Sequence, residues 1–175
     1  MEIPAETLTD EDLVLTRWRP SRLGELAATA GESAGYIGVW LPWAMNGYGE
    51  REAAEFLKTT AERWERGEAY EYAVTLAGTL VGGCGLMARE RGMEIGYWLG
   101  EPYTGRGVMT RAAALLTAEA FRTGTPYVEI KHDERNTRSA GVPARLGYRR
   151  VRTEVAAPPL PPACSGTNVV WRKDS

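Results

Sequence analysis

Hydrophobic and polar positions alternate along several short stretches of the chain, which is typical of strands that bury one face. Proline ends the first stretch, and a glycine or a short charged turn separates each of the next three from its neighbour. These three stretches therefore predict two hairpins and an antiparallel meander. The β-favourable runs lie at residues 13–18, 70–77, 79–87, 93–99, 127–131, 149–155 and 167–172.

A helical period replaces this alternation at residues 50–66, where apolar side chains fall on one face and charges on the other. Residues 108–121 are rich in alanine and leucine and contain neither glycine nor proline, so they form the clearest predicted helix. A shorter helix is predicted after Ser21, with that serine as N-cap and Gly31 as the stop, and another at residues 136–146. Strands and helices therefore mix without a strict βαβ repeat.

Two stretches show neither the alternation of a strand nor the period of a helix. Residues 35–50 are rich in glycine and aromatic residues, and we interpret them as an irregular segment that could line a pocket. Residues 156–164 hold four prolines in nine positions, which excludes a helix or a central strand and predicts a stiff loop. This loop could form the opposite wall of the same pocket.

The composition is that of a folded globular protein. The chain has 175 residues, of which 43% are hydrophobic and 25% charged, and this fits one domain, predicted at residues 10–173. A formal net charge of −2 supplies no basic excess to neutralise the phosphates of a nucleic acid. A nucleic-acid partner is therefore not expected.

The N-terminal residues and the cysteines indicate in which cellular compartment the protein is expected. Acidic residues stand where a secretory signal would be basic and then apolar, and no apolar run is long enough to span a membrane. Cys84 and Cys164 form no CxxC motif, which argues against a disulfide framework and against a zinc site. We expect a cytoplasmic protein with no membrane partner and no metal, in which Cys84 is a small buried thiol.

A glycine-bearing turn joins the strand at residues 93–99 to the helix that starts near Val108. At a helix N-terminus the unpaired backbone N–H groups and the positive end of the helix dipole attract an anion. Arg106 adds a cation beside the two glycines of this turn, and Thr110 adds a hydroxyl in the first turn of the helix. The turn is neither a Walker A loop nor a GxGxxG motif, so by itself it is a generic anion site or a plain connection.

Two separated motifs resemble the GNAT superfamily of N-acetyltransferases, and within it the RimJ/RimL-like branch. Residues 95–99 (IGYWL) and the turn that follows match the first motif. The second motif, Asn-x-x-Ser-x-x-x-Pro-x-x-Leu-Gly-Tyr/Phe, matches at residues 136–148. The family writes its phosphate turn Gln/Arg-x-x-Gly-x-Gly/Ala, which falls on Thr104, Gly107 and Met109, so the first and last positions depart from the pattern.

The resemblance implies an α/β (α+β) GNAT fold with acetyl-CoA as co-substrate. Its central sheet would be mixed, mostly antiparallel and twisted, with about seven strands flanked by helices and a splay at the acetyl-CoA site. The strand before the turn would offer its free backbone groups to the pantetheine arm, as an added strand would. The residues that the resemblance assigns to the cofactor are Tyr97, Trp98, Leu99, Thr104, Gly105, Arg106, Gly107, Val108, Met109, Thr110, Asn136 and Ser139.

Acetyl transfer from a thioester to an amine needs a base for the amine and an acid for the departing thiolate. By resemblance, Glu94 and Glu154 compete for the base, and Ser139 is the acid. Trp43, in the irregular segment, is expected to contact the acceptor by its aromatic face. His132 is the single histidine, and we interpret it as a packed side chain with satisfied hydrogen bonds.

The acceptor stays open at this point. A protein or peptide N-terminal α-amine and a small-molecule amine, such as an antibiotic or a metabolite, fit equally well, because the fold does not name the acceptor. The alternative to an enzyme is a GNAT-like module that binds acyl-CoA without turnover, which the two departures in the phosphate turn keep open. The protein is expected to be a monomer or a homodimer.

Overall fold

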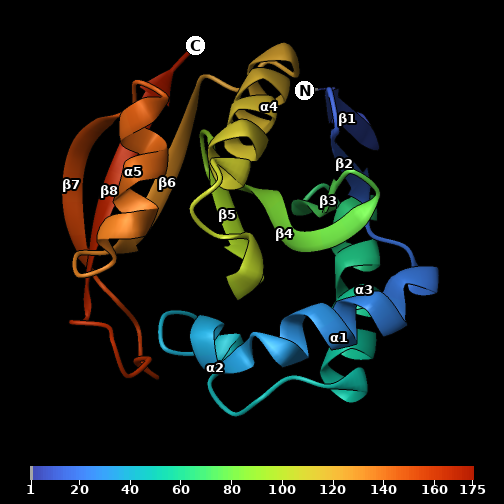
Figure 1. The fold of residues 1–175 in the computed structure, drawn as a ribbon. Coiled ribbons are helices and arrows are strands. Elements are labelled where there is room, and N and C mark those ends of the chain that lie inside the picture. Colours follow the sequence, from blue (N-terminus) through green and yellow to red (C-terminus); the bar gives the residue numbers. More distant parts are fainter. Residues whose placement is uncertain (1) are drawn as a thin grey trace.

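One mixed sheet organises the chain. The computed structural model describes residues 2–175 and places eight strands in the order β1-β2-β3-β4-β5-β6-β8-β7 (Figure 1). Every neighbouring pair is antiparallel except β5 and β6, which run parallel. The strands are β1 Thr7–Asp10, β2 Leu13–Arg17, β3 Ala69–Leu76, β4 Thr79–Ala88, β5 Met93–Leu99, β6 Tyr127–Asp133, β7 Arg149–Val155 and β8 Thr167–Asp174.

Helices cover both faces of this sheet. Figure 1 shows α4 and α5 over one face, whereas α1, α2 and α3 lie on the other side. None of the helices among residues 2–175 is long and apolar enough to cross a membrane. The helices are α1 Leu23–Glu32, α2 Ala34–Ile37, α3 Glu50–Glu65, α4 Val108–Arg122 and α5 Thr137–Arg145, with 3-10 turns at Pro20–Arg22, Pro42–Ala44 and Glu101–Tyr103.

Alternation along the strands separates two cores. In β3, Tyr72 and Val74 belong to the larger core, which also contains Leu116 of α4, whereas Ala73 belongs to a smaller core with Leu57 of α3. Successive side chains of a strand point to opposite faces, so one strand serves both cores. The sheet is therefore covered from both sides in its first half.

The seven predicted strands and the GNAT fold are confirmed, with one strand added. Sequence analysis missed β1 because its four residues are short, polar and only half buried at the sheet edge. The predicted cap of the first helix was wrong. Ser21 lies inside a 3-10 turn, and α1 starts at Leu23 after Arg22 without a side-chain cap.

Gly31 does not stop α1, which continues to Glu32. A Cβ atom at Gly31 would lie 2.7 Å from the carbonyl oxygen of Tyr48, so glycine at this position lets residues 35–50 pass close to the helix. That segment is also less irregular than predicted, because it contains most of α2 and a 3-10 turn at Pro42–Ala44.

The sheet splays between β5 and β6. The two strands pair only at Met93 with Val128, Glu94 with Glu129 and Ile95 with Ile130. Beyond these pairs β6 stays with β8 as far as Asp133, and β5 stays with β4 as far as Leu99. The last four residues of β5 therefore present one backbone edge to the opening, as the resemblance predicted.

Candidate active site

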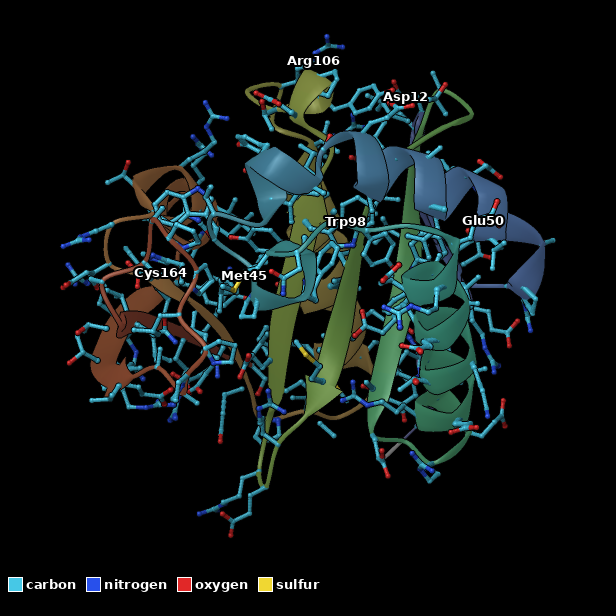
Figure 2. The ribbon with its side chains drawn as sticks, turned by 90° about the horizontal axis from the view of Figure 1, so that it is seen from below. Asp12, Met45, Glu50, Trp98, Arg106 and Cys164 are labelled. Carbon is cyan, nitrogen blue, oxygen red and sulfur yellow. The ribbon has the colours of Figure 1, made fainter. Side chains whose placement is uncertain are left out.

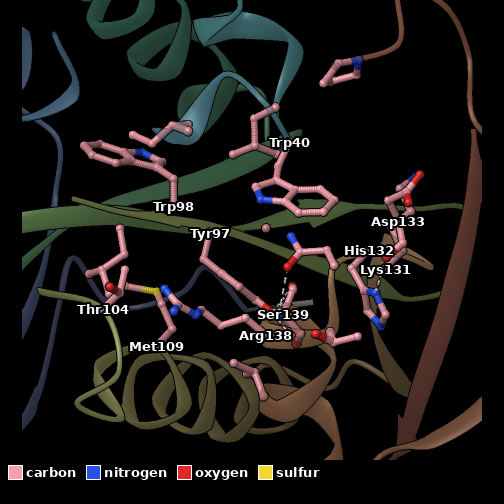
Figure 3. A pocket seen from close by; sticks show the side chains of 18 of the residues that line it. Trp40, Tyr97, Trp98, Thr104, Met109, Lys131, His132, Asp133, Arg138 and Ser139 are labelled. Carbon is pink, nitrogen blue, oxygen red and sulfur yellow. Dashed lines mark hydrogen bonds between the residues drawn. The ribbon is translucent and has the colours of Figure 1, made fainter. Parts of the chain in front are cut away.

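A cavity of about 1040 Å³ occupies the splay. Its walls come from the end of β5, the turn before α4, the end of β6, the start of α5, the segment around α2 and the proline-rich loop. Elements that are distant in sequence therefore meet around one space. Among the labelled lining residues, Thr104 and Met109 lie at one end of the cavity, Tyr97 and Ser139 in its middle, and Lys131, His132 and Asp133 at the other end (Figure 3).

The first end is built on the N-terminus of α4. Gly105 and Gly107 have positive φ angles of +77° and +73°, and Gly107 is the N-cap residue. The first amide to bond back to this cap is that of Arg111, whose N–H donates to the Gly107 carbonyl oxygen at 3.1 Å. The N–H groups of the three residues between them have no partner within the helix, so they form an anion-binding end. All seven predicted residues, 104–110, line the cavity.

Two arginines strengthen the positive potential at this end. Arg106 is exposed on the turn, and Arg145 of α5 donates to the Thr110 hydroxyl at 3.2 Å. Neither guanidinium is paired with a carboxylate among residues 2–175, whereas Arg111 is held by Asp10 and Asp12. Arg145 could not be singled out from the sequence, because a basic residue in the last turn of a helix is common for dipole reasons alone.

The middle of the cavity holds a pair of hydroxyl groups. The Tyr97 hydroxyl lies 2.8 Å from the Ser139 Oγ atom and also donates to the Ser139 carbonyl oxygen at 3.2 Å. Burial raises the pKa of Tyr97 to about 12, although the hydrogen bond with Ser139 acts in the opposite direction. Asn136 is the N-cap of α5, and its Oδ1 atom accepts the Ser139 N–H at 3.2 Å. The side chain of Tyr97 therefore belongs to the site, whereas the sequence pointed only to its backbone.

Glu94 lies in the wall of the cavity toward its second end. Its carboxylate oxygen Oε2 is 3.0 Å from Arg89 and 3.4 Å from the Lys131 Nζ atom. The Glu94 side chain is only 11% exposed. Two ion pairs therefore fix a carboxylate within reach of a group that enters the cavity.

Two predicted site residues lie away from this cavity. Glu154 points along β7, where Arg152 binds it at 2.9 Å and 2.8 Å, and it does not line the cavity. Trp43 packs edge-on against Tyr48 and Trp98, with ring centroids 5.3 Å and 5.7 Å apart, and does not line the cavity either. From the same segment, the cavity instead receives Tyr36, Ile37, Trp40, Leu41 and Pro42.

His132 lines the second end, but both of its ring nitrogens are engaged. The Trp171 indole N–H donates to Nε2 at 2.9 Å, so Nδ1 carries the proton and donates to the Asp133 carbonyl oxygen at 2.7 Å. Cys84 is buried away from the cavity, and burial raises the pKa of its thiol. Neither side chain is placed to act as a free nucleophile or base.

The proline-rich loop closes the second end. Its Ala163 N–H donates to the Val39 carbonyl oxygen at 3.0 Å, which joins the loop to the segment after α2. Asp133 holds the far side by accepting N–H groups from Ser165 and Gly166 at 2.9 Å and 3.1 Å. Burial opposes ionisation of Asp133, but these hydrogen bonds keep its pKa below the ordinary value. The loop residues on the wall are Ala156, Ala157, Pro159, Leu160, Pro161 and Cys164.

Comparison with known proteins agrees with this geometry. Residues 12–149 match the family model described as an acetyltransferase (GNAT) domain. The chain is 28% identical over 148 residues to YdaF of Bacillus subtilis (strain 168), which carries the name of a ribosomal N-acetyltransferase. That match covers 79% of this chain and 79% of YdaF.

Two solved structures share the fold. One is RimL, the ribosomal L7/L12 alpha-N-protein acetyltransferase in complex with coenzyme A, with a TM-score of 0.87 and 21% identity over 97% of this chain and 98% of that chain. The other is the microcin C7 self-immunity acetyltransferase MccE in complex with acetyl-CoA and AMP, with a TM-score of 0.87 and 18% identity over 95% of this chain and 94% of that chain. Both have the strand and helix arrangement of this chain.

Proposed function

Since the chain belongs to the GNAT acetyltransferase family, with acetyl-CoA as donor, we propose that it acetylates the N-terminal α-amine of a peptide or protein. The observation that carries acetyl transfer is the splay of β5 from β6, which leaves a strand edge open beside the N-terminus of α4 for the donor. The name of RimL, an alpha-N-protein acetyltransferase, supports an N-terminal amine as the acceptor, and the name of YdaF supports a ribosomal acceptor.

The residues in the cavity fit the donor. The N-terminus of α4, with Arg106 and Arg145 beside it, suits the pyrophosphate, because amide N–H groups and guanidinium groups both bind phosphate oxygens. The open edge of residues 97–99 suits the amide groups of the pantetheine arm. This placement directs the thioester toward Ser139 and the second end of the cavity.

Glu94 is the base in this proposal. The neutral amine attacks the thioester carbonyl, a C–N bond forms, and the C–S bond breaks. Glu94 takes the proton that the amine loses, directly or through a water molecule. Its place in the cavity wall supports this role, whereas Glu154 lies outside the wall and is paired with Arg152.

Ser139 assists the departing sulfur. Its hydroxyl lies in the middle of the cavity, where it can donate to the thiolate. Because the pKa of Tyr97 is raised to about 12, the phenol stays protonated and shares a hydrogen bond with the Ser139 hydroxyl. Tyr97 therefore acts as a positioning residue in this proposal.

A thiol-release assay with acetyl-CoA tests the function. The acceptor panel contains a short peptide with a free α-amine, the same peptide with that amine blocked, a polyamine and an aminoglycoside. Thiol release with the free peptide alone is the expected result. Release with the small amines alone would refute the peptide acceptor, and acetyl-CoA binding without release for any acceptor would favour a non-catalytic module.

A further inference from the structure

At the second end of the cavity, the carboxylates and the cations differ in how far they are paired within the protein. This end contains the carboxylates of Glu94 and Asp133 and the cations of Lys131 and Arg135. Glu94 is shared by Arg89 and Lys131. Asp133 accepts the N–H groups of Arg135, Ser165 and Gly166 and the Ser165 hydroxyl. Both carboxylates thus already bind donors of the protein, and the contacts of Glu94 all fall on its Oε2 atom, which leaves Oε1 to accept a proton.

The two cations, in contrast, keep free donors. The Arg135 side chain is exposed and has no hydrogen-bond or ion-pair partner among residues 2–175, and the Lys131 side chain is 37% exposed. Lys131 makes one ion pair, at 3.4 Å, with a carboxylate that Arg89 binds at 3.0 Å. A ligand that enters this end meets two cations with unused donors and two carboxylates that already bind donors of the protein.

The carboxylates of the adjoining sheet face are also paired within the protein. Glu94 and Glu129 are paired in register on this face, and Glu129 is bound by both Arg152 and Arg172. The helices α1 and α3 pack on β3 and β4 rather than here, and Figure 2 shows them gathered over the opposite half of the sheet from the orange strands. A chain that leaves the cavity can therefore lie along this face.

We propose that the preferred acceptor is an acidic peptide, in which Asp or Glu residues closely follow the N-terminal residue. This inference rests on the proposed function and specifies its substrate. Arg135 and Lys131 receive the carboxylates of the acceptor, while the α-amine reaches Glu94. A polycationic acceptor is disfavoured, since it meets like charges and only carboxylates that already bind donors of the protein.

Three peptides of equal length and with the same first residue test the proposal. Residues 2–4 of the peptide are aspartates, asparagines or lysines, and kcat/KM is measured at low and high salt. We expect the acidic peptide to exceed the neutral one by roughly fivefold for each carboxylate that finds a cation, and the basic peptide to be the poorest. Salt should reduce the difference because the groups are exposed.

The Arg135→Gln variant tests whether the preference for the acidic peptide arises at the second end of the cavity. It should lower kcat/KM for the acidic peptide several-fold more than for the neutral peptide. Lys58→Gln removes the same charge from the exposed surface of α3 and should leave the preference unchanged. Equal kcat/KM for all three peptides, or a preference that Arg135→Gln does not reduce, would overturn the inference while leaving the proposed function intact. Acetylation of small amines, with none of the three peptides acetylated, would instead refute the proposed function.

Discussion

The hydroxyl oxygen of Tyr97 lies 2.8 Å from the Oγ atom of Ser139, which joins β5 to α5 across the splay. Removing this hydroxyl in Tyr97→Phe leaves Ser139 free to rotate. A hydrogen bond of this kind contributes about 1 kcal/mol, so we expect kcat to fall by roughly five- to tenfold. The KM for acetyl-CoA should change little, and steady-state kinetics separate the two constants.

Tyr148→Phe provides the matched control for that variant. The Tyr148 hydroxyl also makes one buried hydrogen bond, to Thr117 at 2.6 Å, but Tyr148 lies in the core and does not line the cavity. Its loss should lower the melting temperature and leave kcat unchanged. If Tyr97→Phe behaves in the same way, the role of Tyr97 is structural rather than positioning.

Gly107→Ala tests the anion-binding turn. Gly107 has a φ angle of +73° at the start of α4, and alanine in this left-handed region costs roughly 1–2 kcal/mol. Relief of this strain would turn the free N–H groups away from the phosphates, so we expect weaker coenzyme A binding by calorimetry. Gly124→Ala imposes the same strain at φ +88° after the C-terminus of α4 and should lower stability without changing this affinity.

Glu94→Gln and Glu154→Gln compare the two candidate bases directly. Loss of a general base reduces turnover by about a hundredfold or more, and Glu94→Gln should show this loss because Glu94 lies in the cavity wall. Glu154→Gln should keep near-normal kcat, since Arg152 holds that side chain outside the wall. The reverse order of kcat values would assign the base to Glu154.

The lowered pKa of Glu129 leads to a prediction of how the stability of the folded protein depends on pH. The hydrogen bond from Arg152 is the largest cause that lowers its pKa, burial opposes it, and the bond from Arg172 adds to the lowering. A lowered pKa in the folded state stabilises the protein above the unfolded pKa of about 4.3, and this contribution disappears as the pH falls through the folded pKa. Arg152→Gln should therefore destabilise the protein at neutral pH, by urea titration, with a difference that shrinks in acid. A difference that grows in acid would contradict this assignment.

The elements of the donor site could be predicted from the sequence because each is formed by residues that lie close together along the chain. The turn at residues 104–107 and its helix are contiguous, and Asn136 caps the first turn of α5 three residues before Ser139. Their order and spacing matched the GNAT pattern, and the family and fold are confirmed. The roles of the individual residues stay predictions.

Contacts between distant segments could not be predicted in the same way. Arg145 meets Thr110 from a helix 35 positions later, and Arg138 reaches the Tyr36 hydroxyl across 102 positions. Trp43 was expected at the pocket by resemblance of its segment to the RimJ/RimL-like branch, but it packs on the ring of Trp98 while its neighbours line the cavity. Which aromatic of a segment faces a cavity depends on tertiary packing, not on residue type.

Acetylation of a peptide by this protein, followed by intact-mass spectrometry, tests the central claim most directly. The peptide contains one free α-amine and one internal lysine, and a second sample carries a blocked α-amine. The account predicts that the first peptide gains one acetyl group, on its N-terminal residue, and that the blocked peptide gains none. Acetylation of the blocked peptide on lysine, or of neither peptide while a small amine is acetylated, would contradict it.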